Sequence, residues 1–137
     1  MALEKKIFII CPVREADQNE KDFLAEYVSM LEMEGNRVHL PARDTRQDDA
    51  TGGYNICSQN YDAICESDEV HVYWTEKSKG SLFDIGASFG ENKKRGKPIK
   101  LINREYVEKA VERQKKEGIK KSFEMVLLRL DDECRNS

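Results

Sequence analysis

Four short runs with strand character, most of them apolar, alternate with longer amphipathic segments along this chain, and this alternation restricts the folds that it can adopt. The runs lie at residues 7–10, 37–40, 70–74 and 99–102. Short apolar runs of this kind are typical of strands that are buried in a parallel sheet. Because a helix is expected between successive strands, the sequence predicts an α/β protein with a doubly wound parallel sheet of four to five strands.

Helix and turn signals define the segments between these runs. Gly35 is a good helix stop, and Pro12 and Pro41 end the first two strands. Residues 42–53 are polar and predict one long loop, which in a compact domain is usually functional or mobile. The expected helices span residues 17 or 18 to 34, 54–66, 81–95, 104–117 and 121–133.

Size and charge exclude several classes of protein. The chain has 137 residues, which suits one domain over residues 1–137. The net charge of −3 argues against binding a nucleic-acid polymer, which needs a basic surface. No apolar stretch approaches membrane-spanning length and no signal peptide is visible, so we expect a cytoplasmic protein without a membrane partner. The four cysteines form no CxxC pair and no cluster with histidine, so no metal site is expected.

A ligand site is expected at one edge of the sheet, because ligands of doubly wound folds bind at the carboxyl ends of the strands. The loop after the first strand contains Arg14 but no G-x-G-x-x-G, which disfavours a dinucleotide-binding enzyme. Arg14 is either a phosphate ligand or a solvated side chain. The loop after the second strand contains Arg43 and Asp44, which are either sugar ligands or ordinary surface residues.

Residues 78–86, between the third strand and its helix, are the most informative stretch. A loop that opens a helix is an anion site, because unpaired backbone N–H groups and the helix dipole face the same point. Ser78, Gly80 and Ser81 are candidates to bind a phosphate, and the alternative is an ordinary turn and helix cap. Trp74, at the end of the strand, either stacks on a base or packs into the core.

Asp84 admits two interpretations. A carboxylate beside an anion site can attack or stabilise the oxocarbenium-like state of glycosyl transfer. Alternatively, Ser81 and Asp84 form a capping box, in which an acid in the first helical turn has no catalytic role. Both interpretations stay open on the residues alone.

Three stretches together resemble the nucleoside 2-deoxyribosyltransferase superfamily, which includes the deoxynucleoside 5′-monophosphate N-glycosidases. They are residues 7–14, ending in Pro-Val-Arg, the strand entry at 67–72, and Ser-Lys-Gly-Ser-Leu-Phe-Asp-Ile-Gly at 78–86 with Gly-Lys-Pro-Ile at 96–99. The resemblance spans roughly residues 5–103. It implies a flavodoxin-like homodimer or higher oligomer that cleaves the N-glycosidic bond of a nucleoside or nucleotide without a metal or organic cofactor.

The resemblance also implies roles for individual residues. Arg14, Ser78 and Gly80 match positions that hold phosphate in the glycosidases. Asp84 stands where the family usually has a glutamate nucleophile, and its side chain is one methylene shorter. Asn60 aligns with a second family carboxylate, although an amide cannot act as an acid.

Our first hypothesis is therefore an N-glycosidase or deoxyribosyltransferase-like enzyme. The second is a non-catalytic nucleotide-binding or sensing module on the same fold, and the third is a flavodoxin-like flavin protein. In the first hypothesis Asp84 acts on the anomeric carbon, Asn60 and Asp44 orient the sugar, and Trp74 or Phe83 flanks the base. The expected ligands of a phosphate or other polar group are Arg14, Ser78, Gly80 and Ser81, and Arg43 is a further candidate for binding the substrate.

Overall fold

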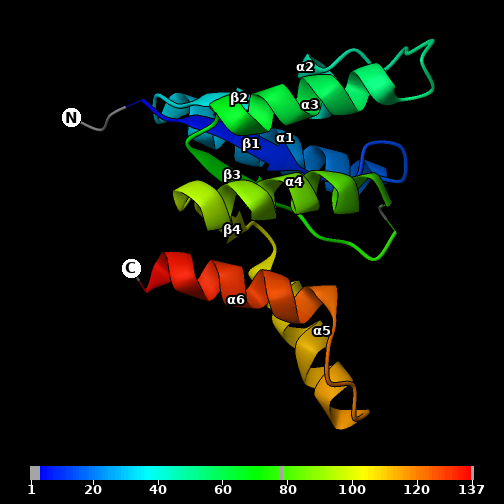
Figure 1. The fold of residues 1–137 in the computed structure, drawn as a ribbon, viewed down its shortest axis with the longest axis vertical. Helices are drawn as coiled ribbons and strands as arrows, with labels where there is room; N and C mark the ends of the chain where they lie inside the picture. The colour runs from blue at the N-terminus through cyan, green and yellow to red at the C-terminus, as the bar shows by residue number, and fades with distance from the viewer. Residues whose placement is uncertain (1–3, 78, 137) are drawn as a thin grey trace.

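A four-stranded parallel sheet forms the centre of the protein (Figure 1). The computed structural model describes residues 4–77 and 79–136. The strands lie in the order β2-β1-β3-β4, and this order is that of a flavodoxin-like doubly wound fold. In the register, Ile7 pairs with Val38 on one side and Glu69 on the other. The strands are β1 (Lys6–Ile10), β2 (Arg37–His39), β3 (Glu69–Val72) and β4 (Ile99–Leu101).

The helices follow the expected segments with three main differences. The last helix, α6, spans Phe123–Arg135 rather than residues 121–133. A short helix, α2, occupies the start of the stretch that was predicted to be a loop, and α4 begins at Lys79 rather than at Ser81. Within the described residues, no helix combines the length and the apolar character that crossing a membrane requires. The helices are α1 (Gln18–Met33), α2 (Pro41–Asp44), α3 (Tyr54–Glu66), α4 (Lys79–Arg95), α5 (Arg104–Lys116) and α6 (Phe123–Arg135).

Local chemistry explains where α1 begins and ends. The side chain of Asp17 accepts the backbone N–H of Glu20 at 2.8 Å, and the Glu20 side chain accepts the N–H of Asp17 at 3.2 Å. This capping box satisfies backbone donors that the first turn leaves unpaired. Gly35, with φ of 97°, lets the chain turn directly after the helix because glycine tolerates positive φ.

Alternate residues of each strand face two separate cores. Ile7 and Ile9 pack against α1 on one face of the sheet. Phe8, Ile10 and their neighbours on β3 and β4 pack on the opposite face, where α3 and α4 lie side by side in Figure 1. Helices α5 and α6 add to this second core and extend from the β4 end of the sheet.

Helix α6 covers the open edge of β4. The carboxylate of Asp131 accepts the backbone N–H of Leu101 at 2.8 Å, and the Cys134 thiol donates to the carbonyl of Ile99 at 3.4 Å. Side chains of a helix thus satisfy edge groups that a fifth strand would otherwise pair, which is one way that proteins protect a sheet edge. Within the described residues, the sheet therefore has four strands.

A buried polar cluster lies on the α1 side of the sheet. Glu69 of β3 accepts hydrogen bonds from Lys5 at 2.8 Å and His71 at 3.0 Å, and it pairs with Lys100 at 3.2 Å. His71 also contacts the hydroxyl of Tyr27 at 2.6 Å. Burial lowers the pKa of His71, although Glu69 opposes this. Since His71 is then neutral, we assign its Nε2–H to Glu69 and its Nδ1 to the Tyr27 hydroxyl proton.

Candidate functional site

A cleft of about 480 Å³ opens at the carboxyl ends of the strands. Its walls come from the loops after β1 and β2 and from the facing sides of α3 and α4. In Figure 1 these loops gather at one end of the sheet, to the right of the view. The cleft therefore lies where a doubly wound fold is expected to bind its ligand.

Asp84 lies in the second turn of α4 and lines this cleft. Because α4 begins at Lys79, Ser81 is inside the helix rather than at its N-cap, and the capping-box alternative is wrong for this pair. Burial raises the pKa of the Asp84 carboxyl from 3.8 to about 6, and a hydrogen bond from Asn60 partly opposes the shift. A half-buried carboxylate with a raised pKa in a cleft is typical of a functional site.

Asn60 of α3 is the polar neighbour of this carboxylate. Its amide nitrogen lies 3.5 Å from Oδ2 of Asp84, and its own side chain is almost fully buried. The thiol of Cys11, at the end of β1, also lines the cleft. Burial and the nearby Asp84 charge raise the pKa of Cys11 to about 12, so this thiol stays neutral at physiological pH.

The outer part of the cleft contains the residues predicted to bind a polar group. The exposed side chain of Arg14 follows β1, and Gly80 and Ser81 belong to the first turn of α4. A cation and the N-terminal turn of a helix thus line the same cavity, which suits an anion. Ser78, the other predicted ligand, lies outside the described residues.

Phe83 provides an apolar surface in the cleft. It is 66% exposed although it is a large aromatic residue, and it lines the cavity together with Ile56 of α3. An exposed aromatic ring beside polar groups suits the flat face of a nucleobase. Trp74, the alternative for this role, is 4% exposed and donates its indole N–H to Glu124 at 2.8 Å. The structure therefore places Trp74 in the core and not in the lining of the cleft.

Arg43 and Asp44 also lie outside the lining of the cleft. They sit in α2, where the guanidinium of Arg43 pairs with Asp44 at 2.9 Å and with Glu32 of α1 at 3.2 Å. Asp44 also accepts the backbone N–H of Leu40 at 2.9 Å. These contacts hold α2 against α1. The same segment instead contributes Pro41 and Gln47 to the cleft.

Glu15 and Gln47 line the cleft although our sequence analysis did not propose them. Glu15 could have been proposed from the sequence, because it is adjacent to Arg14 in the loop at the end of β1. Gln47 carried no comparable signal. The amide nitrogen of Gln47 donates to the carbonyls of Pro41 at 2.9 Å and Thr45 at 3.0 Å, contacts that depend on the local fold of α2.

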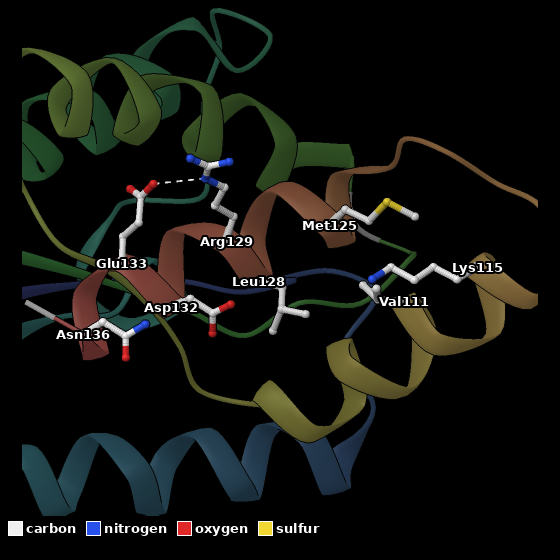
Figure 2. Close-up of a pocket in the computed structure, with 8 residues that line it drawn as sticks. All are labelled: Val111, Lys115, Met125, Leu128, Arg129, Asp132, Glu133 and Asn136. Atoms are coloured by element: carbon white, nitrogen blue, oxygen red, sulfur yellow. Dashed lines mark hydrogen bonds and ion pairs between the residues drawn. The ribbon is translucent and has the colours of Figure 1, made fainter.

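A larger hollow, of about 630 Å³, lies between α5 and α6 (Figure 2). Its charged side chains belong to helix surfaces, and Arg129 pairs with Glu133 at 3.1 Å within α6. Its lining residues come from α5, from α6 and from Asn136 directly after α6, and not from the loops at the carboxyl ends of the first three strands. In the part of the chain that the structure describes, no three His, Cys, Asp or Glu side chains gather as metal ligands.

Comparison with solved structures identifies a similar fold. A 2-deoxyribosyltransferase from the psychrotolerant bacterium Bacillus psychrosaccharolyticus matches with a TM-score of 0.57 and 18% sequence identity, over 70% of each chain. A scan against protein-family models finds no match, and neither does a search of curated proteins. Similarity at this identity concerns the fold, while function depends on the site. The chain therefore has a flavodoxin-like α/β fold that is similar to the fold of this 2-deoxyribosyltransferase.

Proposed function

We propose that this protein cleaves the N-glycosidic bond of a nucleoside or nucleotide, or transfers its sugar, with Asp84 as the acting carboxylate. The observation that carries the proposal is the half-buried Asp84, whose pKa is raised to about 6 in a cleft at the carboxyl ends of the strands. The similar fold of a 2-deoxyribosyltransferase supports the same class of chemistry.

In this mechanism the bond between C1′ and the base nitrogen breaks, and the base leaves with the electron pair. Asp84 either forms a bond to C1′ or stabilises the positive charge that develops there. Water or a second base then accepts the sugar. A poorly hydrated carboxylate is suited to this role because its interaction with the developing charge is weakly screened.

The other residues of the cleft supply binding. Arg14 and the first turn of α4, with Gly80 and Ser81, provide positive potential for a phosphate or another polar group. Asn60 donates to Asp84 and so helps to orient it. Phe83 and Ile56 offer apolar contact to a base. We propose no step that uses Arg43, Asp44 or Trp74.

The test is to incubate the protein with deoxynucleosides and nucleoside monophosphates and to measure released base by chromatography. We expect release that Asp84→Ala abolishes. Asp62→Ala is the matched control, because Asp62 is an exposed carboxylate on neighbouring α3. Release that survives in Asp84→Ala would show that another group performs the chemistry.

A non-catalytic nucleotide-binding or sensing module is the second candidate. Asn60 favours this candidate, because its amide lies beside Asp84 at a position where proton transfer would require an acid. This candidate predicts binding of a nucleotide by calorimetry without release of base. Base release by the wild-type protein that is lost in Asp84→Ala would exclude it.

Self-association and a cytoplasmic location stay predictions. An apolar groove between α4 and α6 supports self-association, because Phe89 and Val126 are partly exposed along it. Light scattering coupled to gel filtration measures the mass in solution. A mass of about one chain at all concentrations would contradict the expected homodimer or higher oligomer.

A further inference from the structure

A chain of hydrogen bonds leads from β2 to the carboxylate in the cleft. Nε2 of His39 lies 2.8 Å from the hydroxyl oxygen of Thr45, which follows α2. That hydroxyl donates to Oδ1 of Asn60 at 2.7 Å, and the amide nitrogen of Asn60 faces Asp84 at 3.5 Å. Residues of β2, α3 and α4, together with the residue that follows α2, thus form one line of polar groups.

The direction of these bonds follows from the chemistry of the groups. The Thr45 hydroxyl has a single hydrogen, which it gives to Asn60, so it accepts a hydrogen from Nε2 of His39. The side-chain carbonyl oxygen of Asn60 therefore faces Thr45 and accepts its hydrogen. Its amide nitrogen is left on the side of Asp84, and every donor in the line points toward the carboxylate.

Burial makes this arrangement rigid. Thr45 is 3% exposed and Asn60 is 6% exposed, so water has little access to either side chain. The His39 ring stacks on Phe8, with 5.2 Å between ring centroids and 12° between planes. In a rotated Asn60 amide the oxygen would face the Asp84 carboxylate, so the donor to that carboxylate would be lost.

We propose that Thr45, oriented by His39, is a positioning residue that fixes the amide of Asn60 so that a donor faces Asp84. The claim that this positioning serves catalysis rests on the function proposed above. The charged groups around the line are Arg43 and Asp44 near His39, while the Cys11 thiol near Asp84 is neutral. None of these groups replaces the donor that Asn60 supplies.

The experiment compares Thr45→Val, which keeps the shape and removes the hydroxyl, with Thr45→Ser, which keeps the hydroxyl. Carboxyl-carbon NMR of ligand-free protein labelled at aspartate measures the titration of Asp84, assigned with Asp84→Asn. We expect a higher Asp84 pKa in Thr45→Val, because the charged form loses a donor, and a wild-type value in Thr45→Ser. Base release should fall about tenfold in kcat in Thr45→Val with little change in KM.

Ser67→Ala is the matched control, because Ser67 is a buried hydroxyl that bonds the carbonyl of Ile64 outside this line. It should leave the Asp84 titration unchanged. If Thr45→Val does not fold, His39→Phe removes the first donor while keeping an aromatic ring against Phe8. The same upward shift is expected there.

An unchanged Asp84 titration in the folded Thr45→Val or His39→Phe protein overturns the positioning proposal. The readout on ligand-free protein separates this result from failure of the proposed function. If wild-type protein releases no base but Thr45→Val shifts the titration, the positioning proposal stands for the carboxylate and the enzymatic proposal fails.

Discussion

Asn60 and Asp84 face each other from neighbouring helices, with 3.5 Å between the amide nitrogen and the carboxylate oxygen Oδ2. This single donor does not compensate for the burial of Asp84, since the pKa of the carboxyl remains about 6. At neutral pH the folded protein therefore holds a negative charge where the surroundings disfavour it. Such a residue is expected to reduce stability and to serve function.

We predict that Asp84→Asn stabilises the protein at pH 7. The raised pKa means that the folded state binds more protons than the unfolded state between pH 4 and pH 6, so wild-type stability falls as the pH rises through this range. Removing the charge should increase the free energy of unfolding by about 2 kcal/mol at pH 7, and by much less below pH 4. Urea denaturation at both pH values measures the difference. Equal stability of the two proteins at pH 7 would contradict the burial of this charge.

We predict that base release by the wild-type protein depends on pH with a midpoint near 6 on the acid side. The ionised form of Asp84 is the active one, so kcat/KM should rise as the carboxyl loses its proton. Initial rates between about pH 3 and pH 8 give the profile. A midpoint near the ordinary aspartate value of 3.8 would mean that Asp84 is not the group that controls the rate.

We predict that Arg14→Gln weakens binding of phosphorylated substrates. A charge-assisted hydrogen bond to phosphate is worth enough that KM should rise by about 10- to 100-fold. Substrates without phosphate should be unaffected. Arg46→Gln is the control, because Arg46 is highly exposed and does not line the cleft. An equal effect of Arg14→Gln on both substrate types would argue against a phosphate contact.

We predict that Glu69→Gln destabilises the protein by about 2–4 kcal/mol at pH 7, because Lys5 and Lys100 lose a charged partner and His71 loses its carboxylate acceptor. Burial by itself raises the pKa of Glu69, but bonds from Lys5, His71 and Lys100 outweigh it and lower the pKa to about 2. The stabilisation is therefore complete above about pH 4.5 and is lost as the pH falls toward 2. Denaturation curves across this range test the pH dependence. Glu4→Gln, which removes an exposed pair with Arg37, should cost less than about 1 kcal/mol.

Patterns along the chain were enough to predict most of the fold. Asp17, Gly35 and the apolar runs act through the nearest few residues, so their effects can be read from the sequence. The start of α4 was harder to predict. Ser81 and Asp84 have the spacing of a capping box, but they lie about one turn after the residue at which the helix begins. The burial of α6 was also harder to predict: Leu127 and Leu130 are buried whereas Phe123 and Val126 are exposed, a difference that apolar spacing alone does not indicate.

Some residues of the candidate site could be predicted from the sequence, and others could not. Arg14, Gly80 and Asp84 line the cleft, as expected from their position at strand ends. Arg43 and Trp74 also lie near strand ends, but their side chains do not line the cleft, because each has a partner on a distant segment. Those partners are Glu32 of α1 and Glu124 of α6, and periodicity along the chain contains no information about them.

The sequence by itself determined the order of strands and helices and the edge at which a ligand should bind, because both depend on periodicity and topology. Only the tertiary structure decided which side chains meet there. The line from His39 through Thr45 and Asn60 to Asp84 exists because β2, α2, α3 and α4 pack around one point. The same packing removes water from Asp84 and changes its chemistry, since a pKa responds to burial and neighbours in space rather than in sequence.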